Sequence, residues 1–273
     1  MKAVSEIPQL SIKELLSVED FFQDYVKSGV WKIGFYDDED STLEYAGDAV
    51  VARLTRFLPS FKKSTKVLCI GAQAYNLGLH LVETYECKVE VFCDEDDISE
   101  AAYKKLEAQP RPDKMNLNKG SIMATPYDWD TFDFVLSVES LAFHTQKDRV
   151  LREVSYLLKP SGRVLFTVLH QQPSESENLL PWAEAMHVIS LSDYQRIGRS
   201  IDLEQVLERD MTEHLLTHYR KLSKLLEQEK TKAQKQMGKA TAAKFHDWLQ
   251  AGILGLDKGN LGWGIVQFQK RNV

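Results

Sequence analysis

The sequence predicts a doubly wound α/β domain, in which helices cover both faces of a mostly parallel β-sheet. Short apolar runs of four to seven residues alternate along the chain with longer segments that have the apolar spacing of helices. The run 163–169 is largely apolar, as expected for a strand that is buried on both faces of a parallel sheet. These two observations favour a parallel sheet over a sandwich or a helical bundle.

Composition narrows the classes of protein to which the chain can belong. Its 273 residues carry 34 Lys and Arg against 40 Asp and Glu, a net charge of −6, and 43% of them are hydrophobic. Such values are typical of a globular protein and exclude disordered, collagen-like and disulfide-stapled chains. The acidic balance argues against nucleic acid and an anionic membrane surface as partners.

The first residues and the three cysteines favour a cytoplasmic location for the protein. Acids and a proline interrupt the first residues, where a secretory signal needs an apolar core, and no run of about 18 apolar residues occurs in the sequence. The three cysteines, Cys69, Cys87 and Cys93, lack C-x-x-C spacing. We expect them to be buried, reduced thiols, and we expect no metal site.

Two helices are predicted before the alternation of strands and helices begins. The segment 11–28 has apolar residues three and four positions apart and ends at Gly29. A second helical pattern covers 46–58 and is stopped by Pro59.

The central part of the chain is predicted to supply five strands. A helix beginning after Ser99 and another at 146–158 lie between them, and the second stops at the turn signal 159–162. The predicted strands are 67–71, 89–93, 115–119, 132–138 and 163–169.

Beyond His170 the regular alternation ends. We expect a polar loop at 171–178, a long helix at 179–200, a sixth strand at 203–208 and a second long helix at 212–236. A shorter helix at 240–251 and a terminal strand at 263–270 follow. The predicted organisation is an N-terminal helical segment (1–60), a cofactor-binding core (61–170), a helical cap insertion with the sixth strand (171–250) and a terminal strand that completes the sheet (251–273).

The candidate ligand residues follow the strands, because a doubly wound sheet binds ligands at the carboxyl ends of its strands. Gly71 follows the first strand, and Ser137 lies in the fourth. Asp94 follows the second strand about 20 residues after the glycine turn, where an acid accepts hydrogen bonds from a ribose diol. Glu95 is the alternative acid, and a solvated acidic loop is the other interpretation of this cluster.

A series of short motifs resembles the class I S-adenosylmethionine-dependent methyltransferases over about residues 62–170. No single motif is specific for this family, but their occurrence together in this order is. The motifs are Gly120-Ser121-Ile122, Thr125-Pro126, Phe132-Asp133-Phe134-Val135, Glu153 and Leu157-Leu158-Lys159-Pro160-Ser161-Gly162.

The flanking segments narrow the resemblance to the sarcosine/dimethylglycine N-methyltransferase group. The matching segments are Trp31 to Tyr36, with its G-x-Y pattern, Gly120-Ser121, His218-Tyr219 and Gly259 to Gly264. The resemblance implies a seven-stranded Rossmann-like sheet with a helical cap. It further implies methylation of a small metabolite, with an amine as the expected acceptor.

The resemblance also implies which residues bind the cofactor and the substrate. S-adenosylmethionine is expected to contact Gly71, Gln73, Asp94, Glu95, Ser121, Ile122 and Ser137. Aromatic faces stabilise ammonium and sulfonium groups, so Trp31, Tyr36, Trp182 and Tyr219 are expected to bind substrate, with Tyr36, His144 and Tyr219 as positioning candidates. The alternative for each aromatic residue is packing in the core, and the alternative for the apolar stripe of helix 212–236 is a dimer interface.

The turn after the first strand departs from the family pattern. The family has an acid and two further glycines where this chain has Cys69, Gln73 and Tyr75. Either the cofactor binds in an altered way, or the chain is a methyltransferase-like protein that acts as a partner subunit, as a metabolite-binding module or in a non-methylating rearrangement. A homodimer or a partner methyltransferase subunit is compatible with either reading.

Overall fold

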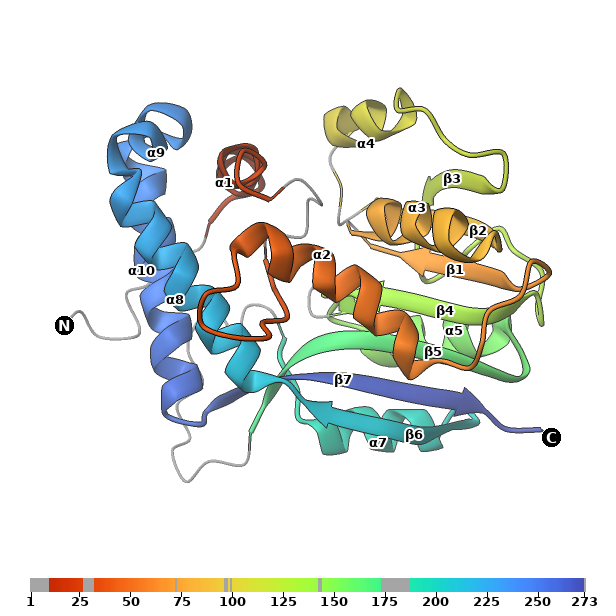
Figure 1. The fold of residues 1–273 in the computed structure, drawn as a ribbon. Helices are drawn as coiled ribbons and strands as arrows, with labels where there is room; N and C mark the ends of the chain where they lie inside the picture. The colour runs from red at the N-terminus through yellow and green to blue at the C-terminus, as the bar shows by residue number, and fades with distance from the viewer. Residues whose placement is uncertain are drawn as a thin grey trace. The chain divides into compact units, whose positions relative to one another are not determined.

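The computed structural model describes residues 10–26, 32–71, 73–95, 98, 100–141, 144–172 and 187–272 (Figure 1). The chain forms two compact units. The sheet unit comprises Leu54–His170, Ile189–Asp210 and Trp263–Val273, and the helical unit comprises Met1–Arg53, Gln171–Val188 and Met211–Gly262.

The sheet unit contains a seven-stranded sheet in the order β3-β2-β1-β4-β5-β7-β6, which confirms the predicted doubly wound fold. The pairs β1–β2, β1–β4, β2–β3 and β4–β5 are parallel, and β6–β7 is antiparallel. The strands are β1 (Lys66–Ile70), β2 (Lys88–Asp94), β3 (Met115–Gly120), β4 (Phe132–Val138), β5 (Leu158–Gln171), β6 (Leu203–Asp210) and β7 (Leu261–Lys270).

Helices cover both faces of the sheet, with α3 on one face and α5 on the other (Figure 1). The helices of this unit are η2 (Thr55–Phe57), α3 (Ala74–Tyr85), α4 (Glu100–Glu107), α5 (Lys147–Leu157) and α7 (Leu191–Arg199). The central strands are buried along most of their length, and this burial on both faces together with the apolar stripe of the covering helices accounts for the layering.

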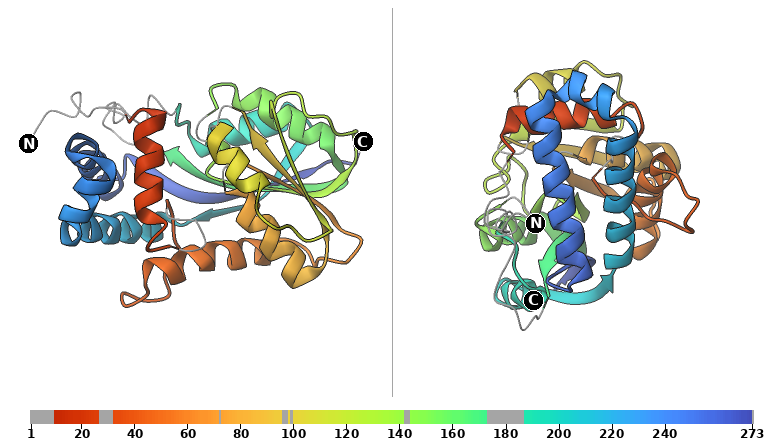
Figure 2. Two further views of the ribbon diagram at one scale, coloured as in Figure 1. Left: turned by 90° about the horizontal axis from the view of Figure 1, so that it is seen from above. Right: turned by 90° about the vertical axis from the view of Figure 1, so that its left-hand side faces the viewer.

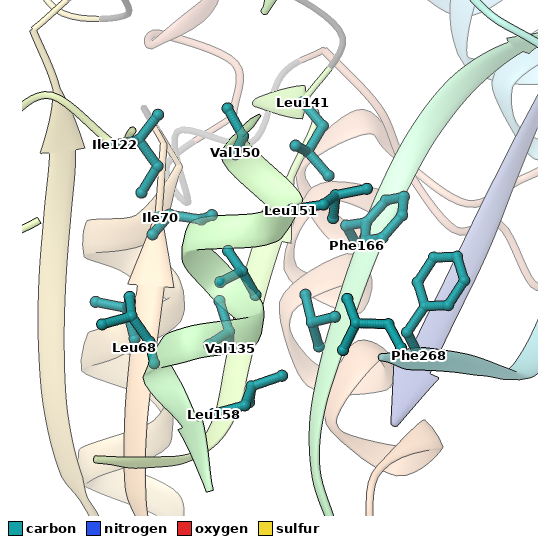
Figure 3. Close-up of a cluster of buried hydrophobic side chains, with 14 of the residues drawn as sticks. Leu68, Ile70, Ile122, Val135, Leu141, Val150, Leu151, Leu158, Phe166 and Phe268 are labelled. Atoms are coloured by element: carbon teal, nitrogen blue, oxygen red, sulfur yellow. The ribbon is translucent and has the colours of Figure 1, made fainter. Parts of the chain in front are cut away.

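The main core of the unit lies between the sheet and α5. Leu68, Val135 and Phe166 from three strands pack with Val150 and Leu151 of α5, and all five are fully buried (Figure 3). Burial of such side chains contributes about 1.5–3 kcal/mol each. The core therefore fixes the strands whose carboxyl ends carry the candidate site.

The helical unit is built from α1 (Ile12–Phe22), α2 (Leu43–Leu54), α8 (Thr212–Gln228), α9 (Lys230–Met237) and α10 (Lys239–Asp257). Figure 2 shows α8 and α10 running side by side. Helix α1 begins with a capping box between Ser11 and Glu14, and Phe22 at its end packs against Phe245 of α10 with ring centroids 5.6 Å apart. Of the described helices, none is both long and apolar enough to cross a bilayer.

The predicted helix 212–236 is wrong, because the structure divides it into α8 and α9 at Glu229. The buried stripe of α8 ends at Leu226, and the next buried side chains are Ala233 and Met237. These positions continue the spacing of the stripe, seven and four residues further on, so the apolar pattern does not reveal the break; α9 packs against α1.

Other element bounds also differ from prediction. The first helix ends at Phe22 rather than at 28, and the helix predicted at 46–58 is α2 followed by η2. Of the helix predicted at 179–200, residues 179–186 lie outside the described residues, and α7 begins at Leu191 because Ser190 caps it by accepting a hydrogen bond from the Asp193 amide.

Candidate functional site

The candidate site residues of the sheet unit gather at the carboxyl edge of the parallel strands. Gly71 follows β1, Asp94 ends β2 and Ser137 lies next to the last residue of β4. Residue pairing between β1 and β2, and between β1 and β4, places these three strand ends level with one another. The predicted ligand edge is thus formed by residues that are far apart in the sequence.

Gly71 allows the turn after β1 to pass close to the loop after β4. Its φ of 99° lies in the left-handed region, and a Cβ built on it would stand 2.5 Å from the Cβ of Ser140. An L side chain is therefore excluded on two grounds. The Gly71 amide also donates to the Phe92 carbonyl at 3.2 Å, which joins the turn after β1 to the neighbouring strand β2.

The three departures from the family turn have different surroundings. Tyr75 is buried, and its hydroxyl donates to the Pro110 carbonyl at 3.2 Å. Cys69 lies fully buried in β1, where burial raises the pKa of its thiol well above the ordinary value, so it is neutral and does not replace a carboxylate. Gln73 remains in the turn, 6% exposed, directly before α3.

The two acids at the end of β2 have distinct environments. Asp94 is 3% exposed, and its Oδ2 accepts a hydrogen bond from the Ile122 amide at 2.8 Å. The neighbouring Glu95 has an exposed side chain, and its amide donates to the Gly120 carbonyl at 2.9 Å. Asp94 therefore holds the loop after β3 in place, while the side chain of Glu95 remains accessible.

Ser121 and Ile122, which are predicted to contact the cofactor, belong to that same loop. Ile122 is buried in the main core (Figure 3), and Ser121 is half-buried with its Oγ accepting a hydrogen bond from the Met123 amide at 3.4 Å. The cofactor contacts expected of Ser121 and Ile122 stay predictions.

The end of β4 carries two polar groups that bear on binding. The Oγ of Ser137 is buried and has no hydrogen-bond partner among the described residues. Glu139 follows β4 with a φ of 58°, a left-handed conformation that is uncommon for glutamate. Its amide donates to Thr167 Oγ1 at 3.0 Å, and its Oε1 accepts a hydrogen bond from Trp263 Nε1 at 2.6 Å.

Sequence reasoning did not single out Glu139 as a site residue. Glu139 is 7% exposed, and burial of a carboxylate charge is costly unless hydrogen bonds compensate for it. The indole donor comes from Trp263, 124 positions away in the sequence. The acid at the end of the fourth strand was the signal that could have identified it.

His144 lies beyond β4 in the same unit and is 8% exposed. Its carbonyl accepts a hydrogen bond from Lys147 Nζ at 2.7 Å, and burial lowers the pKa of Lys147 to about 8. The positioning role expected of His144 stays a prediction. Within the described residues, no group of three His, Cys, Asp or Glu side chains suits a metal ion.

The predicted positioning residue Tyr36 belongs to the helical unit, where it contacts two histidines of α8. Its hydroxyl lies 2.6 Å from His218 Nδ1 in a buried hydrogen bond, and its amide donates to His214 Nδ1 at 3.1 Å. Gly34 permits this approach, since a Cβ there would lie 2.8 Å from His218 Nδ1. Burial raises the pKa of Tyr36, so the hydroxyl stays protonated.

The remaining substrate candidates differ in what can be said of them. Tyr219 is 3% exposed and packs against Trp248 with ring centroids 5.4 Å apart, as the core-packing alternative expects. Trp31 and Trp182 lie outside the described residues.

The residues at the carboxyl edge fit S-adenosylmethionine. The left-handed turn at Gly71 brings backbone close to the edge, and the accessible carboxylate of Glu95 suits a ribose diol. The buried Ser137 Oγ without a described partner suits a polar group of a ligand. These residues would hold the cofactor, with Asp94 fixing the loop beside it.

Comparison with known proteins finds methyltransferases. A family model described as a methyltransferase domain matches residues 91–166. The sarcosine/dimethylglycine N-methyltransferase of Halorhodospira halochloris is 25% identical over 242 residues, which cover 87% of this chain and 87% of that enzyme. The glycine/sarcosine/dimethylglycine N-methyltransferase of Actinopolyspora halophila is 26% identical over 242 residues, which cover 86% of this chain and 42% of that longer enzyme.

The fold agrees as well. A crystal structure of a candidate sarcosine dimethylglycine methyltransferase from Galdieria sulphuraria superposes with a TM-score of 0.83 at 19% identity, over 95% of this chain and 99% of that one. The strand order, the matched domain and these similar enzymes support a class I S-adenosylmethionine-dependent methyltransferase.

Proposed function

We propose that this enzyme methylates the nitrogen of a small amine metabolite of the sarcosine or dimethylglycine type. The similar enzymes are named as N-methyltransferases of sarcosine and dimethylglycine, and one of them also of glycine. The observation that carries the proposal within the structure is the buried carboxylate of Glu139, which immediately precedes Ser140, the residue in contact with the Gly71 turn.

A buried negative charge beside the turn favours a cationic ligand. The Trp263 indole fixes Glu139 Oε1 by a hydrogen bond of 2.6 Å, so the carboxylate has a defined position before any ligand arrives. A protonated amine gains from this charge because the surroundings have a low dielectric constant. An acceptor without a positive charge does not gain in this way.

When bound, S-adenosylmethionine supplies an electrophilic methyl carbon. A protonated nitrogen has no lone pair, so the bound ammonium would first give its proton to the Glu139 carboxylate. The free nitrogen would then take the methyl group in an in-line displacement that releases S-adenosylhomocysteine, and the protein's contribution is to orient that nitrogen and to exclude water. Glu139 orients the amine, Glu95 holds the ribose of the donor, and Asp94 keeps the loop of Ile122 in place through its hydrogen bond to the Ile122 amide.

The role in substrate binding that the family resemblance implies for Tyr36 stays a prediction. The protonated hydroxyl of Tyr36 is paired with His218 Nδ1, so the ring is held in one orientation. Tyr36→Phe keeps the ring and removes this hydrogen bond. We expect it to raise KM for the amine about tenfold and to leave the dissociation constant of the cofactor unchanged.

Titration calorimetry with S-adenosylhomocysteine, followed by transfer of a labelled methyl group to glycine, sarcosine and dimethylglycine, tests the proposed activity. We expect cofactor binding in the micromolar range, about −8 kcal/mol, and turnover with at least one of the three amines. Glu139→Gln keeps an acceptor for the Trp263 indole and should lower kcat/KM for the amine by about 100-fold, because truncating a buried charge contact costs roughly 2–5 kcal/mol.

Matched variants at the end of β2 separate the roles of the two acids. Glu95→Gln should weaken cofactor binding at least tenfold with no change in the urea midpoint, whereas Asp94→Asn should lower the midpoint. Glu107→Gln, an exposed acid of α4, serves as the control. Cofactor binding without turnover of any amine, in the wild type and at millimolar acceptor, would overturn the proposed substrate class.

A cytoplasmic location is part of the proposal, and it is supported by three buried cysteines that are free thiols. The dimer or paired subunit also stays a proposal, which sedimentation velocity of the purified protein tests.

A further inference from the structure

A pocket of about 370 Å³ lies at the amino edge of the sheet unit, away from the carboxyl edge that carries Gly71. The turn before β4 and the end of α5 form one side of it, and the turn between α7 and β6 and the end of β7 form the other. Strand β7 runs opposite to β4, so its last residues reach this edge (Figure 1). The volume lies within the range of about 300–1,000 Å³ that is usual for small-ligand sites.

The walls of this pocket, which we call the amino-edge pocket, are joined by backbone hydrogen bonds. The Asp130 amide donates to the Tyr156 carbonyl at 3.0 Å, and the Arg271 amide donates to the Asp202 carbonyl at 3.0 Å. These bonds fix the backbone of the two segments on each side of the pocket, which gives a ligand site a preformed frame.

A stacked aromatic pair forms one wall. The rings of Trp129 and Tyr156 lie 4.9 Å apart between centroids, with an interplanar angle of 16°. Trp129 is 71% exposed although one of its faces is covered by Tyr156, so its other face is open to solvent. A large, exposed, rigidly supported indole is suited to stacking with a planar ring.

Charged groups line the rest of the pocket. Lys270 is already neutralised by Asp130, with Nζ 2.7 Å from Oδ1. Arg152 and Arg271 are exposed, and neither forms a salt bridge within the described part of the chain. Asp202 contributes an exposed carboxylate. The local excess of positive charge contrasts with the net charge of −6 for the whole chain.

We propose that the amino-edge pocket binds a nucleoside monophosphate. The base stacks on the open face of Trp129, Arg152 and Arg271 hold the phosphate, and Asp202 accepts hydrogen bonds from the sugar hydroxyls. Guanidinium groups suit phosphate because they donate paired hydrogen bonds to its oxygens. This site is separate from the carboxyl edge, so it does not depend on the proposed methyl transfer.

Equilibrium dialysis with radiolabelled guanosine 5′-monophosphate tests the proposal on the full chain, with S-adenosylhomocysteine present at saturation. We expect binding of one equivalent with a dissociation constant below 1 mM, about −4 kcal/mol or tighter. Trp129→Ala and Arg152→Gln should each weaken it at least tenfold, whereas Arg199→Gln, an exposed arginine outside the pocket, should not change it. Trp129→Phe, which keeps a planar ring, should retain most of the affinity.

Guanosine, inorganic phosphate and a measurement of self-association separate the proposed nucleotide site from its alternatives. Guanosine and inorganic phosphate should each bind at least tenfold more weakly than the nucleotide, and equal binding of either one would overturn the assignment of base and phosphate subsites. A self-association that Trp129→Ala abolishes, together with no nucleotide binding, would identify the surface as an interface between copies. Glu95→Gln should leave nucleotide binding intact, so failure here is distinguishable from failure of the proposed activity.

Discussion

Lys147 offers a quantitative test of the electrostatics near the candidate site. It is 3% exposed and begins α5, where the helix dipole disfavours a positive charge. Burial lowers its pKa from 10.5 to about 8, which corresponds to about 3 kcal/mol at 1.36 kcal/mol per unit. At neutral pH the folded protein therefore holds a charged ammonium at a cost of this size.

The sign of the pH dependence follows from the lowered pKa. Below pH 8 both folded and unfolded states bind the proton, and between pH 8 and 10.5 the unfolded state binds more, so stability from this group rises with pH. Lys147→Met removes the group. We expect the free energy of unfolding of the wild type, minus that of the variant, to increase by about 3 kcal/mol from pH 7.5 to 10.5.

Urea unfolding of both proteins across this pH range measures the difference directly, because all other titrating groups are common to the two. Lys104→Met, which changes an exposed lysine of α4, is the matched control and should show a flat difference. A flat difference for Lys147→Met as well would show that the ammonium is solvated, and the reasoning from burial would then be wrong.

Three further substitutions test the carboxyl edge. Gly71→Ala should lower the free energy of unfolding by about 1–3 kcal/mol, because of the left-handed φ and the contact with Ser140, as measured by urea unfolding. Trp263→Phe should lower the free energy of unfolding by about 1–3 kcal/mol, because Glu139 Oε1 loses its indole donor. In the Glu139→Gln background this decrease should be smaller, as a double-mutant cycle would measure. Gln73→Gly should change cofactor affinity less than threefold in calorimetry, since the side chain is already packed away; a gain of tenfold or more would mean that Gln73 obstructs the site.

The strands of the parallel core could be predicted from sequence because each is a compact apolar run with turn residues at its ends. The predicted strand 132–138 has the bounds of β4, and the predicted helix 146–158 differs from α5 by one residue at each end. The ends of the peripheral helices could not be predicted in the same way. The break at Glu229 depends on packing of α9 against α1, which local spacing does not encode.

The candidate site could likewise be predicted only in part. Gly71 and the acids at the end of β2 could be found because topology alone sends strand ends to one edge. Sequence reasoning favours Asp94 over Glu95 as the ribose acid, and this assignment stays a prediction; the hydrogen bond between Asp94 and the Ile122 amide could not be predicted from the sequence. The pairings of Glu139 with Trp263 and of Tyr36 with His218 join residues 124 and 182 positions apart, and no local pattern predicts such contacts.

The altered turn after β1 weighs less against cofactor binding than its sequence suggests. A substituted glycine obstructs a ligand only when the new side chain points toward it, and Tyr75 is instead anchored at the Pro110 carbonyl. The missing acid at Cys69 removes a charge, but Glu139 supplies a buried carboxylate at the same edge, one residue from the Ser140 contact with Gly71. Glycine is retained at the one position of the turn where both φ and the neighbouring side chain exclude any other residue. The turn therefore keeps the backbone path that close approach of a ligand requires.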